Sequence, residues 1–212
     1  MNPEVTVGLA LYDYLPNLIW IAGSYFLINA LKAELKKNPL YILIISLTLV
    51  LITGTLKATW KLLIAAVDAN ILILSDIQFP LMGTGFFLMF LSLLSLLLKK
   101  DKGGGEKQLA VAIPFSKIFL PLMILGSFGS TICLIIIAKR RKAILALTFY
   151  VIFLVTSSTM GYIGSKIVTH SYLIVLIEQT LNSCSTLMWT LGSYFLWKTH
   201  RERGTLIGTS KG

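Results

Sequence analysis

The sequence predicts an all-α protein, a polytopic bundle of six transmembrane helices. Only 13% of its 212 residues are charged, whereas a soluble domain has about 25%. The mean hydropathy is +0.81, and several apolar runs approach or exceed the roughly 18 residues of a membrane-spanning helix. A transmembrane barrel would show short alternating segments instead.

The net charge of +10 does not indicate a nucleic-acid partner, because the basic residues lie in clusters between the apolar runs. That placement is typical of loops that touch anionic lipid headgroups. We therefore expect the lipid bilayer, and no nucleic acid, as a partner. The clusters include Lys32, Lys36 and Lys37, then Lys99, Lys100 and Lys102, then residues 139–142, and finally Lys198, Arg201 and Arg203.

The first half, residues 1–98, holds three expected helices, at residues 9–31, 40–66 and 71–98. Pro16 lies near the start of the first, where proline is tolerated. One helix over residues 61–100 would span about 60 Å, twice the ~30 Å membrane core. A break is therefore required, and Asp68-Ala69-Asn70 supplies the turn residues for it. An alternative makes residues 62–75 a separate span and gives seven helices, but that segment is short for a crossing.

A polar linker with a glycine triplet follows at residues 99–117, and such composition predicts flexibility. The second half, residues 118–198, holds the remaining three helices, which we expect at residues 118–138, 143–167 and 172–197. Residues 199–212 are polar and glycine-containing, and we expect them to form a loose tail.

The two halves resemble each other weakly. Leu15-Pro16 matches Leu120-Pro121, and Leu47-Thr48 matches Leu147-Thr148. Three helices per half would invert the second half relative to the first, an arrangement common in transporters. In that arrangement the basic residues divide almost evenly between the two membrane faces, so the positive-inside rule assigns no orientation.

Ionisable side chains inside apolar helices identify the candidate site, since each costs about 2.5–3.5 kcal/mol on insertion scales. The residues expected to line a solute or ion pathway are Asp13, Lys57, Lys61, Asp76, Glu178, Gln179 and Asn182. Asp76 and Glu178 would be its midplane carboxylates.

Each candidate has a structural alternative. The helical spacing places Asp13 on one face with Asn17 and Trp20, and its carboxylate could simply interact with a helix dipole. Lys57 and Lys61 could reach the membrane interface, or one could pair with Asp68 or Asp76. The polar face that contains Glu178 must look into the bundle, where its groups could serve only for hydrogen bonds between helices.

These features favour a small integral-membrane carrier or channel for a small polar solute or ion, coupled to protons through either carboxylate. The alternative is a membrane sensor or complex subunit that does not transport, and a third hypothesis is a lipid-directed enzyme. Because phosphate-loop, dinucleotide-binding and metalloprotease motifs are absent, we expect no catalytic residue, metal or cofactor. We also expect a prokaryotic cytoplasmic membrane. The sequence does not define the oligomeric state and leaves a homo-oligomer open.

Overall fold

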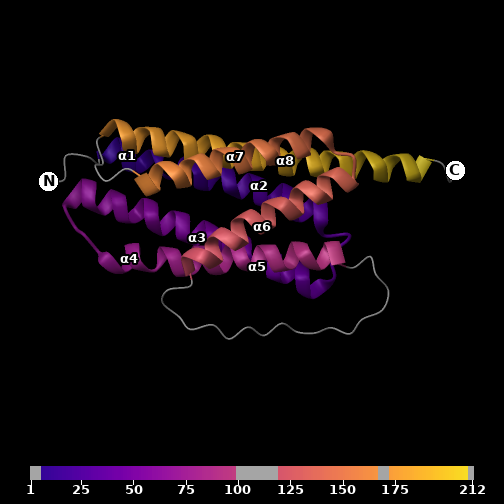
Figure 1. Ribbon diagram of the computed structural model, residues 1–212, viewed down its shortest axis with the longest axis horizontal. Helices are drawn as coiled ribbons and strands as arrows, with labels where there is room; N and C mark the ends of the chain where they lie inside the picture. Colours follow the sequence, from indigo (N-terminus) through magenta and orange to yellow (C-terminus); the bar gives the residue numbers. More distant parts are fainter. Residues whose placement is uncertain (1–5, 99–118, 167–171, 210–212) are drawn as a thin grey trace.

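The computed structural model describes residues 6–98, 119–166 and 172–209, and these form eight helices without a strand (Figure 1). The expected 99–117 linker lies outside the described residues. The helices are α1 (Val7–Tyr12), α2 (Leu15–Leu31), α3 (Lys37–Val67), α4 (Leu72–Asp76), α5 (Gln78–Leu98), α6 (Phe119–Arg140), α7 (Ile144–Lys166) and α8 (Tyr172–Thr209).

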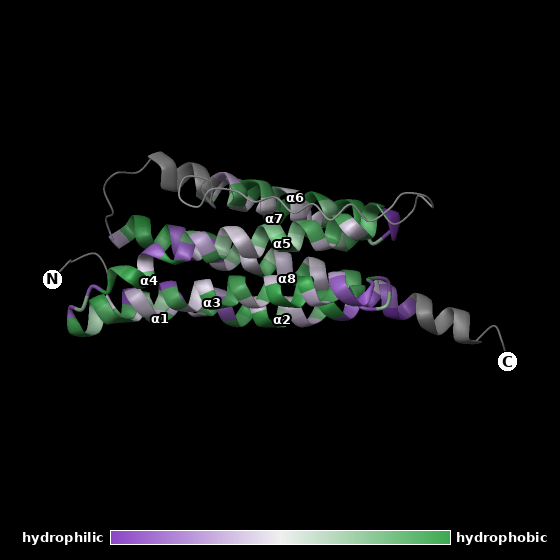
Figure 2. Cartoon of the chain, turned by 90° about the horizontal axis from the view of Figure 1, so that it is seen from below, coloured by the Kyte–Doolittle hydropathy of each residue, from purple (hydrophilic) through white to green (hydrophobic). Residues whose placement is uncertain are grey.

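Four helical stretches are long and apolar enough to cross a membrane: Val7–Leu31, Lys37–Val67, Leu72–Leu98 and Pro121–Arg140. Apolar residues dominate the middle of the bundle, and polar residues gather toward its ends (Figure 2). Large apolar side chains such as Leu18 and Ile144 point outward, 64% and 75% exposed. A soluble protein would bury them, whereas lipid accommodates them, so the bundle has the surface of an integral membrane protein.

The chain turns where the sequence predicts the break after the second span. Asp68 adopts a left-handed conformation (φ 54°, ψ 28°) that ends α3, a conformation that Asp tolerates better than most residues. Trp60 Nε1 donates a hydrogen bond to Asn70 Oδ1 at 3.0 Å across the turn. Residues 62–75 therefore do not form a separate helix, because this turn interrupts them.

The helix α8 continues to Thr209, although the sequence predicts its end near Trp197. No proline follows the last span, and Lys198 Nζ lies 4.0 Å from Glu202 Oε1 one turn later. Such a pair gives modest support to a helix. The segment expected as a loose tail is thus helical as far as Thr209.

The helices α5 and α6 run parallel, with the last turn of each at the same end of the bundle (Figure 1). A Cβ on Gly126 would lie 2.5 Å from Phe87 N, and one on Gly129 would lie 2.6 Å from the ring of Phe90. Further along, Arg140 Nη1 donates to the Leu97 carbonyl at 3.4 Å. The contacts advance in the same direction along both helices.

This parallel pair overturns the expected inversion of the second half. Inversion requires α5 and α6 to be antiparallel, since a short linker would join them on one membrane face. The described helices of both halves therefore run in the same three directions.

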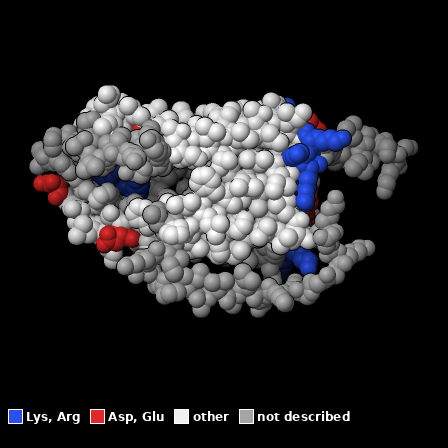
Figure 3. Space-filling model, viewed as in Figure 1, with Lys and Arg blue, Asp and Glu red and all other residues white. Residues whose placement is uncertain are grey.

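Parallel halves bring the basic connections together at one end of the molecule, which we call the basic end (Figure 3). Arg141 Nη2 lies 2.6 Å from Glu34 Oε1, and His200 Nδ1 lies 3.9 Å from the same oxygen. The expected even division of charge is thus wrong for the described residues. The basic end carries Lys32, Lys36, Lys37, Lys139, Arg140, Arg141, Lys142, Lys198 and Arg201.

Two tryptophans form the centre of the bundle. The rings of Trp20 and Trp189 stack with centroids 4.0 Å apart, and Trp20 Nε1 donates to the Leu47 carbonyl at 3.1 Å. Trp189 is 1% exposed. Gly23 lies against this ring so closely that any Cβ there would collide with it. These contacts join α2, α3 and α8 with little free space.

Candidate functional site

The two lysines of α3 continue an inward-facing row of side chains. The row begins with Leu43, Leu47 and Val50, which are 0%, 3% and 8% exposed. Lys57 and Lys61 follow at helical spacing on the same face. The row runs from the basic end toward the opposite end, where Lys61 is partly buried and Lys57 is exposed.

Lys61 forms an ion pair with Asp13. Its Nζ lies 2.6 Å from Asp13 Oδ2, and the two side chains are 16% and 7% exposed. Asp13 lies where α1 ends, just before α2 begins. Next to it, the Tyr14 hydroxyl and Thr59 Oγ1 form a hydrogen bond of 2.8 Å. The lysine that we expected to reach the interface or to pair with Asp68 or Asp76 thus pairs with Asp13.

Lys57 lies one turn before Lys61 and forms no ion pair or hydrogen bond with a residue that the structure describes. The charges that act on it are those of Lys61, Asp13 and Glu178. Its side chain is nevertheless accessible. Both properties fit a position in an open depression among charged neighbours, and Figure 3 shows basic atoms inside a hollow at the end opposite the basic end.

Glu178 enters this group from the second turn of α8. It is half-buried and interacts with Lys57, yet no ion pair within 4.0 Å joins the two side chains. Asn182 follows one turn later, and Trp189 completes the same line. Because Trp189 is buried against Trp20, the line faces the interior, as the sequence predicts. The carboxylate nevertheless lies near the helix start, not at the expected midplane.

Buried amide groups near these charges lack partners. Gln179 is 3% exposed, and neither its Nε2 nor its Oε1 has a hydrogen-bond partner among the described residues. Asn17 Nδ2 is also buried and has no hydrogen-bond partner among the described residues. A buried polar group without a partner costs about 1–3 kcal/mol. Such groups are retained where water or a ligand can satisfy them.

Asp76 lies apart from the cluster. It is the last residue of α4 and is exposed, at the same end of the molecule as the hollow. No described contact joins it to either lysine of α3. The structure therefore joins Asp13 to Lys61, with Lys57 one turn away on α3. Glu178 acts on Lys57 through its charge alone, Gln179 and Asn182 follow it on α8, and Asp76 lies outside this group.

Two further residues belong to the site although the sequence analysis did not select them. Asn17 Oδ1 occupies the space over Gly54, where a Cβ would collide with it. The signal was available, because Asn17 lies one turn after Asp13 on the same face, and Gly54 lies one turn before Lys57 on the inward row. To predict the contact between Asn17 and Gly54, one must know how α2 and α3 are aligned along each other, and the spacing of residues within one helix does not define this alignment.

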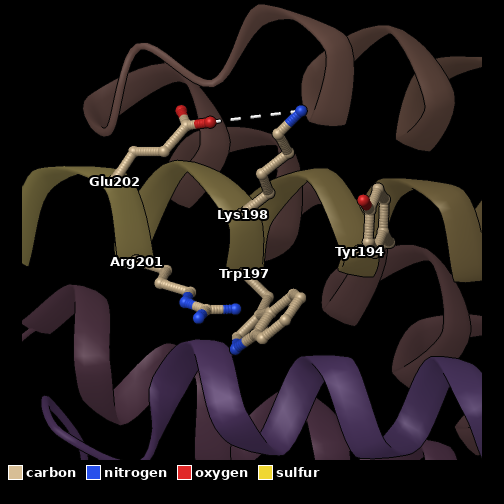
Figure 4. Close-up of a pocket in the computed structure, with 5 residues that line it drawn as sticks. All are labelled: Tyr194, Trp197, Lys198, Arg201 and Glu202. Atoms are coloured by element: carbon tan, nitrogen blue, oxygen red, sulfur yellow. Dashed lines mark ion pairs between the residues drawn. The ribbon is translucent and has the colours of Figure 1, made fainter.

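A pocket of about 290 Å³ lies at the basic end. Tyr194, Trp197, Lys198, Arg201 and Glu202 line it (Figure 4). The Arg201 guanidinium lies 5.7 Å from the Trp197 ring centroid, while Lys198 and Glu202 extend to the other side of α8. Aromatic and basic side chains of this kind mark a membrane–water interface, so we assign this pocket no separate function.

Comparisons with protein-family models, with curated proteins and with solved structures found no match. The fold defines the class as a helical membrane bundle, and any function must be argued from the charged cluster at one end of it.

Proposed function

We propose that the protein is a small membrane carrier whose solute binds in the hollow between α2, α3 and α8. One observation carries this proposal: ionisable groups from separate helices, Asp13, Lys57, Lys61 and Glu178, converge on inward faces at one end of an apolar bundle. Charges at such positions are expensive and usually serve transport or binding.

The bundle is closed between the hollow and the basic end, as in a carrier open to one side. The stacked Trp20 and Trp189 fill its centre. Beyond them, Arg141 is 8% exposed and donates from Nη1 to the Ala30 carbonyl at 3.1 Å. Transport would require these contacts to separate while the hollow closes, the alternation that carriers use.

The arrangement of helices supports the same class. The pair α5 and α6 is parallel, and so is the pair α2 and α8, in which Thr190 Oγ1 donates to the Ile19 carbonyl at 2.9 Å. The pairs α3–α5 and α7–α8 are both antiparallel. If α2, α3 and α5 are exchanged with α6, α7 and α8, the same pairs of helices lie in contact in the same relative directions. We therefore infer a repeat related by an axis along the helices, a symmetry that some transporter families have.

The charge distribution suggests an orientation. Lys and Arg accumulate on the cytoplasmic side of membrane proteins, so the basic end would face the cytoplasm and the hollow would open to the opposite side. Glu178 is a half-buried acid on the side to which the hollow would open. We therefore include coupling to protons in the proposal.

The experiment begins with binding and continues with flux. Purified protein is screened against small polar solutes by thermal stabilisation, and each solute that binds is then tested for uptake into proteoliposomes. We expect uptake by the wild type, loss of uptake in Glu178→Gln, and normal uptake in the matched variant Asp76→Asn, whose acid lies outside the cluster. Equal uptake by liposomes with and without protein would contradict the carrier.

A second candidate is a membrane receptor or complex subunit that binds a ligand without moving it. The tightly packed tryptophan centre favours it, because nothing described links the hollow to the basic end. Stabilisation by a solute that shows no uptake in either direction would support this candidate over the carrier.

A further inference from the structure

We propose that the ligand is a small zwitterion of the amino-acid type, whose carboxylate binds Lys57 and whose ammonium group binds Glu178. This inference rests on the binding role of the hollow proposed above, but it does not depend on transport.

The argument begins with the charges that are already paired. Lys61 and Asp13 neutralise each other at 2.6 Å, and their low exposure leaves little room for a ligand between them. Lys57 and Glu178 remain, each without an ion pair to any described residue. Lys57 is exposed and Glu178 is half-buried, so a ligand could reach both charges without first breaking an ion pair.

The two unpaired groups have opposite charges and interact with each other, yet they are more than 4.0 Å apart. A direct ion pair would have closed this gap. A molecule placed in it meets an ammonium group on α3 and a carboxylate on α8. A simple anion would leave Glu178 unpaired, and a simple cation would leave Lys57 unpaired. A zwitterion satisfies both.

Neutral polar groups beside the charges fit the same ligand class. Gln179 follows Glu178 and has both of its amide atoms unpartnered while 3% exposed. Asn17 Nδ2, one turn after Asp13, is likewise unpartnered. These amides can hydrogen-bond to a polar ligand or to water bound with it.

The test measures binding to the full chain in nanodiscs, without flux. Probes are the twenty common amino acids, γ-aminobutyrate and glycine betaine. For the tightest amino acid, two analogues are added: the amide, which lacks the carboxylate, and the N-acetyl derivative, which lacks the ammonium group. We expect each analogue to bind roughly tenfold more weakly or worse, since each loses a charge-assisted contact.

Variants assign each end of the ligand. In Lys57→Met the amino acid and its amide should bind equally, and in Glu178→Gln the amino acid and its N-acetyl derivative should bind equally. Lys57→Arg keeps a cation and should keep the preference for a free carboxylate. This variant still tests the role of the cation if Lys57→Met fails to fold. Asp76→Asn should leave every affinity unchanged.

The inference is overturned if no zwitterion binds, if either analogue binds as tightly as the amino acid, or if both single variants retain wild-type discrimination. These results are distinct from failure of the carrier. An amino acid that binds as described without uptake would refute transport and leave the inference intact. Uptake of a different solute that amino acids do not inhibit would support the carrier and refute the amino-acid ligand.

Discussion

Lys61 and Asp13 form an ion pair across the N-terminal hairpin, with Nζ and Oδ2 2.6 Å apart. The pair ties the last two turns of α3 to the break between α1 and α2. Both side chains lie on faces that also contain core residues, Val50 on α3 and Trp20 on α2. The pair therefore holds the wall of the hollow while it leaves Lys57 free of an ion pair with the described residues.

Removing one member of this pair should destabilise the protein more than removing both. Asp13→Asn or Lys61→Met leaves one buried charge unpaired, at a cost of about 3–5 kcal/mol. The double variant leaves no such charge and should recover much of that loss. Unfolding in mixed detergent micelles measures the effect, with the exposed Asp68→Asn as control. Single effects that simply add in the double variant would show that the two charges do not interact.

Gly126→Ala should separate α5 from α6. The new methyl group would lie 2.5 Å from Phe87 N and 2.6 Å from Phe86 C, and backbone atoms cannot move aside as a side-chain tip can. Overpacking of this kind costs about 1–3 kcal/mol. Gly8→Ala is the matched control, since no atom lies within 4 Å of its Cβ position and alanine favours helix. Equal thermal stability of the two variants would contradict the close approach of α5 and α6.

Cross-linking tests the parallel arrangement of α5 and α6 directly. In a background that carries Cys133→Ala and Cys184→Ser, cysteines at Leu97 and Arg140 should be joined by a short bifunctional thiol reagent, because Arg140 reaches the Leu97 carbonyl. Cysteines at Leu97 and Leu122 should not be joined, because Leu122 lies in the first turn of α6. The inverted arrangement predicts the opposite: a cross-link between the cysteines at 97 and 122 and none between those at 97 and 140. After proteolytic cleavage within residues 99–118, a cross-linked protein still migrates as one band in denaturing gel electrophoresis, whereas an unlinked protein separates into two fragments.

Arg141→Lys should weaken the closure of the basic end, although the charge is kept. Arg141 donates to the Ala30 carbonyl at 3.1 Å and also contacts Glu34 Oε1 at 2.6 Å, and a lysine ammonium does not reproduce this fork. We expect a loss of about 1–3 kcal/mol in unfolding free energy, by comparison with hydrogen bonds to charged groups. Arg140→Lys, at an exposed neighbour, should change stability by less than about 0.5 kcal/mol.

Local patterns predicted most of the helical elements and the direction of their inward faces. The turn at Asp68 and the burial of the Trp189 line followed from turn chemistry and helical spacing. The charged candidates were selected because ionisable residues are rare in apolar runs. Their partners were not predictable in the same way: Lys61 could equally have paired with Asp68 or Asp76, since all three acids lie within reach of the end of α3.

The sequence by itself determined that this is a helical membrane bundle with charges near one end of several spans, because hydropathy and periodicity are properties of short segments. Only the tertiary structure decided that Lys61 meets Asp13, that Asp76 lies outside the cluster and that α6 runs alongside α5. Those outcomes depend on helix register and on the path of a long connection, and the free energies that select them come from contacts between residues far apart in the chain.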